Sequence, residues 1–72
     1  MDIRKLPQPD SRWLHKKTGG VYRVLNNAAK FQGSGEHDGT RCIAYQEWDN
    51  RLSTVYFRPA TEFMDGRFTK LD

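Results

Sequence analysis

The sequence predicts one small, mostly β domain, built as a bent antiparallel sheet or a small open barrel with a single short helical turn. Three observations favour this fold class. The 72 residues suffice for one domain with a small core. Short segments rich in β-branched and aromatic residues recur along the chain, as is typical of strands. Turn signals separate these segments at close spacing, which favours antiparallel neighbours.

The first residues differ in composition from the rest. Two prolines stand close together within residues 1–11, and this segment has no hydrophobic period. Such a segment is typical of an extended chain. We therefore expect a flexible N-terminal arm over residues 1–11, which Ile3 and Leu6 could attach to the body, and a single β domain over residues 12–72.

A hairpin and a long loop are predicted after the arm. Residues 12–17 and 21–28 each have the composition of a strand. Gly19 and Gly20 lie between them and can adopt positive φ at a tight reversal. Residues 29–40 contain three glycines among polar side chains, which predicts a mobile loop between strands.

The clearest strand covers residues 41–48, where β-branched, aromatic and small residues follow one another. Successive side chains of a strand point to opposite faces. Ile43 and Tyr45 are therefore expected on one face of the sheet, and Cys42 and Ala44 on the other.

The C-terminal part is predicted to contain two short strands and one helical turn. A turn at 49–51 leads into a strand at 52–59, where a proline ends the ladder because it cannot donate a hydrogen bond. Residues 59–64 can form one helical turn. The dipeptide Asp-Gly at 65–66 is a type I′ turn signal, and 67–71 closes the sheet.

The core is expected to form from the large apolar side chains of these strands. In the strand at 52–59, alternation predicts that Val55 and Phe57 share the buried face. The full set of residues predicted to be largely buried is Trp13, Tyr22, Val24, Ile43, Tyr45, Val55, Phe57, Phe63 and Phe68.

Charge is distributed unevenly along the chain. The formal net charge is +3, of which residues 1–30 carry +5 and residues 31–72 carry −2. A basic first half could face an anionic partner such as nucleic acid or an acidic protein surface. The alternative is that the charges only keep a small domain in solution.

The single cysteine, Cys42, excludes an internal disulfide framework and fits a reducing compartment. No apolar run approaches the length needed to span a membrane, and the N-terminus lacks the apolar core of a signal peptide. We therefore expect a cytoplasmic protein without membrane contact.

Catalysis and metal binding are not expected. A nucleophile needs an adjacent base, and the mid-strand position of Cys42 favours a small core residue. Cys42, His15 and His37 lack zinc-ligand spacing. The glycines of the 29–40 loop have no phosphate-binding signature, and most acidic residues lie in or beside turns. The sequence thus predicts no enzyme, no metal and no other cofactor.

Two kinds of partner stay open from the residues alone. A protein partner would use the arm and the polar loop at 31–40 together with an exposed Trp48 or Tyr56. A nucleic-acid partner would stack its bases on exposed aromatic side chains and pair its phosphates with Lys and Arg. Against the second stands the need of so short a chain to bury most of its aromatic residues.

Three stretches carry a family resemblance: RWLHKKTGGVYRVLNNA at residues 12–28, IAYQEW at 43–48 and VYFRPATEF at 55–63. They resemble the bacterial and phage family catalogued as domain of unknown function sixteen fifty-three. Members typically read Tyr-Arg-His-Tyr/Phe-Lys-Gly, Tyr-x-Val-x-x-x-Ala, Val-x-Tyr and Trp-Val-Arg-Pro, with a Phe shortly after. The matching residues here are His15, Lys16 or Lys17, Gly20, Tyr22, Val24, Ala28, Ile43, Tyr45, Tyr56, Phe57, Arg58, Pro59 and Phe63.

The resemblance covers residues 12–70 and has departures. Trp13-Leu14 stands where the family has Tyr-Arg, Tyr56 stands where it has Trp, and the family's His-Ser-Glu is replaced by the loop. The resemblance implies an SH3-like small barrel and no established enzymatic role. The resemblance does not supply a function; that the chain is a small phage or bacterial accessory protein is a separate prediction.

These considerations predict a non-enzymatic binding module that docks on a host macromolecule, with a protein favoured and a nucleic acid as the alternative. His15 and Arg58 beside Tyr56 are expected to form a recognition patch. The competing interpretation is that Arg58 pairs with Glu62 or Glu47 and only fixes the strand end. The predicted binding residues are His15, Lys16, Lys17, Arg23, Trp48, Tyr56 and Arg58.

Overall fold

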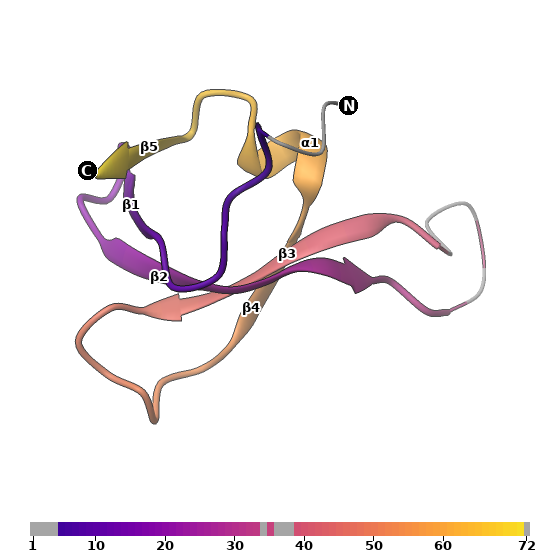
Figure 1. Ribbon diagram of the computed structural model, residues 1–72, viewed down its shortest axis with the longest axis horizontal. Helices are drawn as coiled ribbons and strands as arrows, with labels where there is room; N and C mark the ends of the chain where they lie inside the picture. Colours follow the sequence, from indigo (N-terminus) through magenta and orange to yellow (C-terminus); the bar gives the residue numbers. More distant parts are fainter. Residues whose placement is uncertain (1–4, 34, 36–38, 72) are drawn as a thin grey trace.

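The computed structural model, which describes residues 5–33, 35 and 39–71, contains one open antiparallel sheet and a single short helix (Figure 1). In chain order the elements are β1 (Arg12–His15), β2 (Val21–Lys30), β3 (Arg41–Glu47), β4 (Tyr56–Pro59), α1 (Ala60–Phe63) and β5 (Phe68–Leu71). The strands lie in the order β4-β3-β2-β1-β5. The predicted mostly β fold class is confirmed. The sheet is not a closed barrel, because β4 and β5 are its two edges.

The sheet is strongly curved. The pairing of β2 with β3 shifts register between Val24 and Asn26 and again between Asn26 and Ala29, and such bulges bend a strand and increase its twist. As a result β5 returns over β3, and the ring centroids of Phe68 and Tyr45 lie 5.5 Å apart. We call the face that carries Tyr45 concave and the opposite face convex.

The core fills the concave face. Phe63 of α1 stacks on Phe68 of β5 with ring centroids 4.1 Å apart and an interplanar angle of 8°. It also meets Trp13 edge-on at 5.3 Å. Pro59 precedes the helix, and Ala60 and Phe63 are its buried residues. The buried cluster is Leu6, Trp13, Val24, Ile43, Tyr45, Ala60, Phe63 and Phe68, with the partly buried Tyr22 packed against it.

Two predicted core residues are exposed instead. Phe57 is 65% exposed and Val55 is 42% exposed, so their predicted burial is wrong. For Phe57 the reason is the register of β4, in which Phe57 lies opposite Ala44 and Arg58 lies opposite Ile43, whereas Val55 lies before β4 in the connection from β3. Because side chains alternate along a strand, this register directs Phe57 to the convex face.

Residues 5–11, predicted to belong to the flexible arm, are part of the domain. Leu6 is buried, and Pro7 is among the largest fully buried side chains. The Asn27 Nδ2 donates to the Pro7 carbonyl at 2.8 Å, and the Asp10 amide donates to the Val24 carbonyl at 2.8 Å. The predicted boundary at residue 12 therefore does not separate this segment from the core. Residues 1–4, including Ile3, lie outside the described part.

The turns follow the glycines, with one correction. Gly19 has a φ of +78°, and the His15 amide donates to the Gly20 carbonyl at 2.8 Å, which closes the predicted first hairpin. Gly66 has a φ of +106°, but Asp10 is the single non-glycine residue of the described chain with positive φ. A type I′ turn requires positive φ at both central residues, so the type I′ prediction at 65–66 is wrong.

Strand lengths differ from the expected ones at two places. β2 continues to Lys30, and the Phe31 amide donates to the Thr40 carbonyl at 2.9 Å, which shortens the predicted loop. Residues 34 and 36–38 of that loop lie outside the described part. β4 begins only at Tyr56, and residues 52–55 belong to the preceding connection. Over the described residues, the structure contains no helix long and apolar enough to cross a membrane.

Candidate functional site

The curvature of the sheet brings His15 and Arg58 to one place on the concave face, although β1 and β4 are not neighbouring strands. Both side chains line two adjoining hollows. The aromatic hollow, of about 230 Å³, is lined by His15, Thr18, Tyr22, Tyr45, Tyr56, Arg58 and Phe68. The cationic hollow, of about 520 Å³, is lined by His15, Lys16, Lys17, Arg58 and Arg67.

Arg58 is held by aromatic side chains. Its Nε donates to the Tyr45 hydroxyl at 3.2 Å, and its guanidinium carbon lies 5.5 Å from the Phe68 ring centroid. Glu62, one of the two expected partners of Arg58, pairs with Arg67 at 3.2 Å. Within the described residues no carboxylate pairs with Arg58, so its charge is available to a ligand.

His15 is oriented by the turn that follows it. Its Nδ1 lies 3.0 Å from the Thr18 Oγ1, and its ring meets Phe68 edge-on with centroids 4.8 Å apart. The Gly20 amide donates to the same Thr18 hydroxyl at 3.3 Å. Because the Thr18 contact engages Nδ1, the nitrogen left for a ligand is Nε2.

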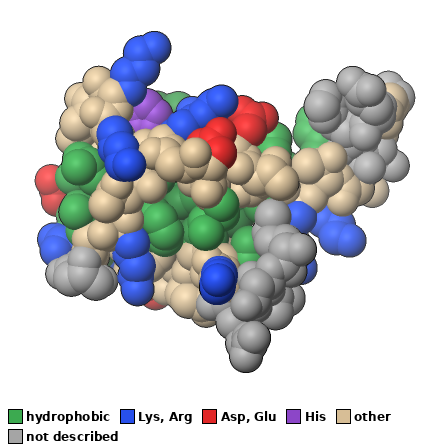
Figure 2. Space-filling view, turned by 90° about the horizontal axis from the view of Figure 1, so that it is seen from above, with side chains coloured by type: hydrophobic (Ala, Val, Ile, Leu, Met, Phe, Trp, Pro, Cys, Tyr) green, Lys and Arg blue, Asp and Glu red, His purple; other side chains and the backbone are tan. Residues whose placement is uncertain are grey.

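The remaining cations of the hollow differ in their partners. The Arg67 guanidinium lies 3.2 Å from Glu62 and 3.1 Å from Asp65, so part of its charge is compensated. Lys16 and Lys17 occupy the exposed turn after β1 and form no ion pair with the described acids. Figure 2 shows basic side chains gathered around a histidine on this side of the molecule, with acidic side chains beside some of them.

The aromatic hollow is a cluster of three tyrosines. Tyr45 is buried and stacks on Tyr56, with centroids 5.6 Å apart and an interplanar angle of 28°. Tyr22 meets Tyr45 at 5.3 Å and a right angle. Tyr56 is 41% exposed. A buried ring therefore supports an exposed one, which makes Tyr56 a stacking platform.

Burial raises the pKa of the Tyr22 phenol above its ordinary value of 10.0, and the neighbouring Tyr56, Tyr45 and Glu47 raise it further, against a hydrogen bond from Thr18. The unfolded chain loses this proton near pH 10.0, before the folded chain does. The stability that the raised pKa of Tyr22 contributes is therefore fully present below pH 10.0. It is lost as the pH rises through the raised pKa of the folded protein.

Tyr22→Phe is accordingly expected to remove a late transition from the alkaline near-ultraviolet titration of the folded protein and to weaken its loss of stability at high pH. Tyr56→Phe, the matched control, should keep a late transition. An unchanged titration curve in Tyr22→Phe would contradict this assignment.

Two of the predicted binding residues lie away from this site. Arg23 is placed over the Trp48 ring, 4.0 Å from its centroid, and Arg12 approaches the same ring at 5.3 Å. Arg23 also lies 3.5 Å from Asp10. A guanidinium thus covers one face of the Trp48 ring. The structure brings together His15, Lys16, Lys17, Tyr56 and Arg58 and separates Arg23 and Trp48 from them.

Sequence reasoning missed Thr18 and Arg67 as site residues and assigned Tyr22 and Tyr45 to the core. Thr18 had a local signal, since a hydroxyl one residue before Gly-Gly often bonds to the turn backbone. Arg67 had none, because it reaches the site through the pairing of β5 with β1, which joins the two ends of the domain.

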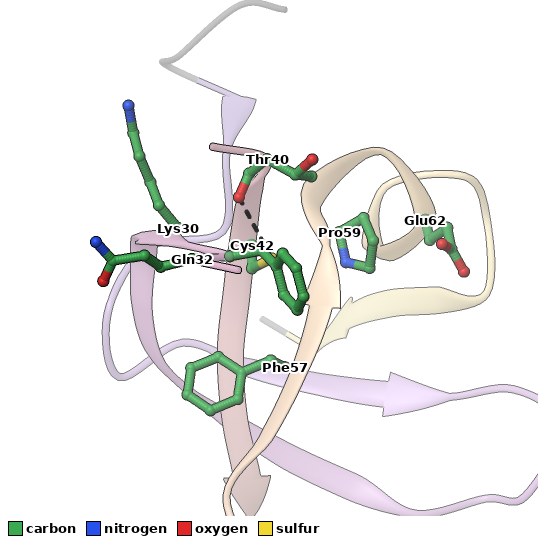
Figure 3. A pocket seen from close by; sticks show the side chains of 8 residues that line it. Lys30, Gln32, Thr40, Cys42, Phe57, Pro59 and Glu62 are labelled. Atoms are coloured by element: carbon green, nitrogen blue, oxygen red, sulfur yellow. Dashed lines mark hydrogen bonds between the residues drawn. The ribbon is translucent and has the colours of Figure 1, made fainter. Parts of the chain in front are cut away.

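A third hollow, of about 590 Å³, lies along β3 and β4 and holds the exposed Phe57 (Figure 3). Cys42 is buried there, and its Sγ lies 3.5 Å from the Thr40 carbonyl. Other residues lining this groove are Lys30, Phe31, Gln32, Thr40, Pro59 and Glu62. The expected burial of Cys42 is confirmed, although it belongs to this groove and not to the concave core. Among the described residues no group of three His, Cys, Asp or Glu side chains is placed to hold a metal ion.

Comparison with known proteins adds no relative to this description. No family model matches the chain, and no curated protein and no solved structure matches it either. The similarity to the family catalogued as domain of unknown function sixteen fifty-three stays a prediction from the sequence.

Proposed function

We propose that this chain is a non-enzymatic binding module that docks on a nucleic-acid single strand through the concave site. The observation that carries this proposal is that Arg58, Lys16 and Lys17 line one hollow without a carboxylate partner among the described residues. Adjoining them is Tyr56, a half-exposed ring backed by a buried one. Cations for phosphates beside a ring for bases are what single-strand binders use.

A nucleic acid fits this site better than an acidic protein surface. Both would satisfy the cations, but only a nucleic acid supplies flat rings for Tyr56 together with a regular row of negative charges. The exposed ring of Tyr56 favours a single strand, because unpaired bases are free to stack on an aromatic side chain.

The proposal predicts a salt-dependent affinity. Phosphate contacts release counterions, so the logarithm of the affinity for a single-stranded oligonucleotide should fall with the logarithm of salt by about 0.7 per contact. Lys16→Ala/Lys17→Ala should reduce this slope by about 1.4 if both lysines contact phosphates. Fluorescence anisotropy of a labelled oligonucleotide across a salt series measures both quantities.

Lys30→Ala is the matched control, since Lys30 is an exposed lysine that lines the groove of Phe57 and neither half of the concave site. It should leave the salt slope nearly unchanged. An equal loss in Lys30→Ala would assign the binding to overall charge, and no binding at low salt would refute the proposal.

Docking on a host protein is the second candidate function. The exposed Phe57 and Phe31, at 65% and 47%, favour it, because contiguous exposed apolar side chains often mark protein contacts. A pull-down from a bacterial lysate tests this candidate. It is supported if one identified protein is captured, if the capture persists after nuclease treatment and at raised salt, and if Phe57→Ala abolishes it. Capture that nuclease abolishes would favour the nucleic acid.

A further inference from the structure

The concave site has an aromatic half and a cationic half, and His15 and Arg58 belong to both. Resting on the proposed function, we infer that it holds one unpaired nucleotide, with the base against the tyrosines and the adjoining phosphate among the cations. A ligand that fills both halves must join a flat ring to a negative group across the boundary that His15 and Arg58 form. A nucleotide has this structure, because its flat base is joined through the sugar to a negative phosphate.

The charges of the site exclude a cationic ligand, although aromatic clusters often bind one. Rings at right angles and in stacks, such as Tyr22, Tyr45 and Tyr56, can enclose a quaternary or methylated ammonium group. Here Arg58 already bonds to Tyr45 and lies over Phe68. A cationic ligand would therefore approach a guanidinium, with Lys16 and Lys17 nearby, and would be repelled.

The polar groups of the aromatic half favour a base over a plain phenyl ring. The half contains the hydroxyls of three tyrosines and of Thr18, together with Arg58 and His15. A ligand that covered these groups without hydrogen bonds would lose free energy. A nucleobase presents donors and acceptors on its edge, whereas the phenyl ring of a phosphotyrosine presents none.

Stacking should depend on Tyr56 in particular. Tyr45 covers one side of its ring at a shallow angle of 28°, and the ring is 41% exposed. A base that stacks on it extends the pair into a column of three rings. Removing one base–aromatic stack typically lowers affinity about 5- to 150-fold.

The test compares two single-stranded oligonucleotides of equal length, one with bases and one with abasic sugars throughout. The unmodified protein should bind the abasic strand about 5- to 150-fold more weakly. Tyr56→Ala should show a similar loss on the strand with bases and little further loss on the abasic strand. Tyr56→Phe should keep most of the affinity, because the ring is retained.

Phe57→Ala is the matched control, because Phe57 is the next residue of β4 and lies on the convex face. It should bind both strands as the unmodified protein does, and circular dichroism should show every variant folded. Equal binding of the two strands by the unmodified protein would overturn this inference and leave the proposed function intact. Binding of neither strand would refute both. Tighter binding of a phosphotyrosine peptide, in competition with the oligonucleotide, would also overturn it.

Discussion

Phe63→Ala is expected to unfold most of the protein at room temperature. Phe63 is fully buried, stacks on Phe68 and meets Trp13 and Tyr45 edge-on. Truncating a buried phenylalanine costs about 3–5 kcal/mol, as lost transfer free energy and a residual cavity. A core of this size supplies roughly 3–5 kcal/mol in total. Urea denaturation followed by tryptophan fluorescence measures the change in the free energy of unfolding.

The matched control is Phe57→Ala, an identical substitution at a residue that is 65% exposed. It should change the free energy of unfolding by no more than about 0.5 kcal/mol, as is usual for surface positions. If Phe57→Ala destabilised the protein as much as Phe63→Ala, the register of β4 described here would be incorrect.

Leu6→Ala is expected to destabilise the protein by about 2–5 kcal/mol, the range for a buried leucine. The side chain is 4% exposed and belongs to the concave core cluster. The segment is also tied to β2 through the hydrogen bond from Asn27 to the Pro7 carbonyl. The midpoint of thermal unfolding, compared with that of the unmodified protein, reports the loss.

Lys5→Ala is the control for this second prediction, because Lys5 precedes Leu6 and is exposed. Its midpoint should stay close to that of the unmodified protein. A Leu6→Ala variant with an unchanged midpoint would show that residues 5–11 behave as the flexible arm that the sequence alone suggests.

The contrast between Leu6 and Ile43 shows which buried residues can be predicted from the local sequence pattern. Ile43 lies in a seven-residue strand, where strand composition and alternation identify the core face without other information. Leu6 lies among prolines, and its burial depends on Asn27 and on a cluster of rings from the rest of the chain. The sequence names Leu6 as a candidate anchor of this segment, but no local pattern in residues 5–11 identifies the side chains that it contacts.

The candidate site shows the same division. The basic turn after β1 and the Arg-Pro pair after Tyr56 can be seen in the sequence, and they led to a patch of His15, Arg58 and Tyr56. Strand order and sheet curvature decided the rest. They leave Arg58 without a carboxylate partner among the described residues, and they place Arg23 and Trp48 elsewhere.

The sequence by itself determined the mostly β fold class, the approximate place of the strands, the hairpin at Gly19 and the burial of Trp13, Val24, Ile43, Tyr45, Phe63 and Phe68. These follow from local composition, from the period of two along a strand and from the need of a short chain to bury its largest side chains. The tertiary structure alone decided the register of β4, because a shift of one residue exchanges the faces of Phe57 and Arg58. It also decided that residues 6 and 7 complete the core and that bulges in β2 curve the sheet until His15 and Arg58 meet. These features depend on pairings between distant residues, and the free energy that selects them comes from contacts that no short segment contains.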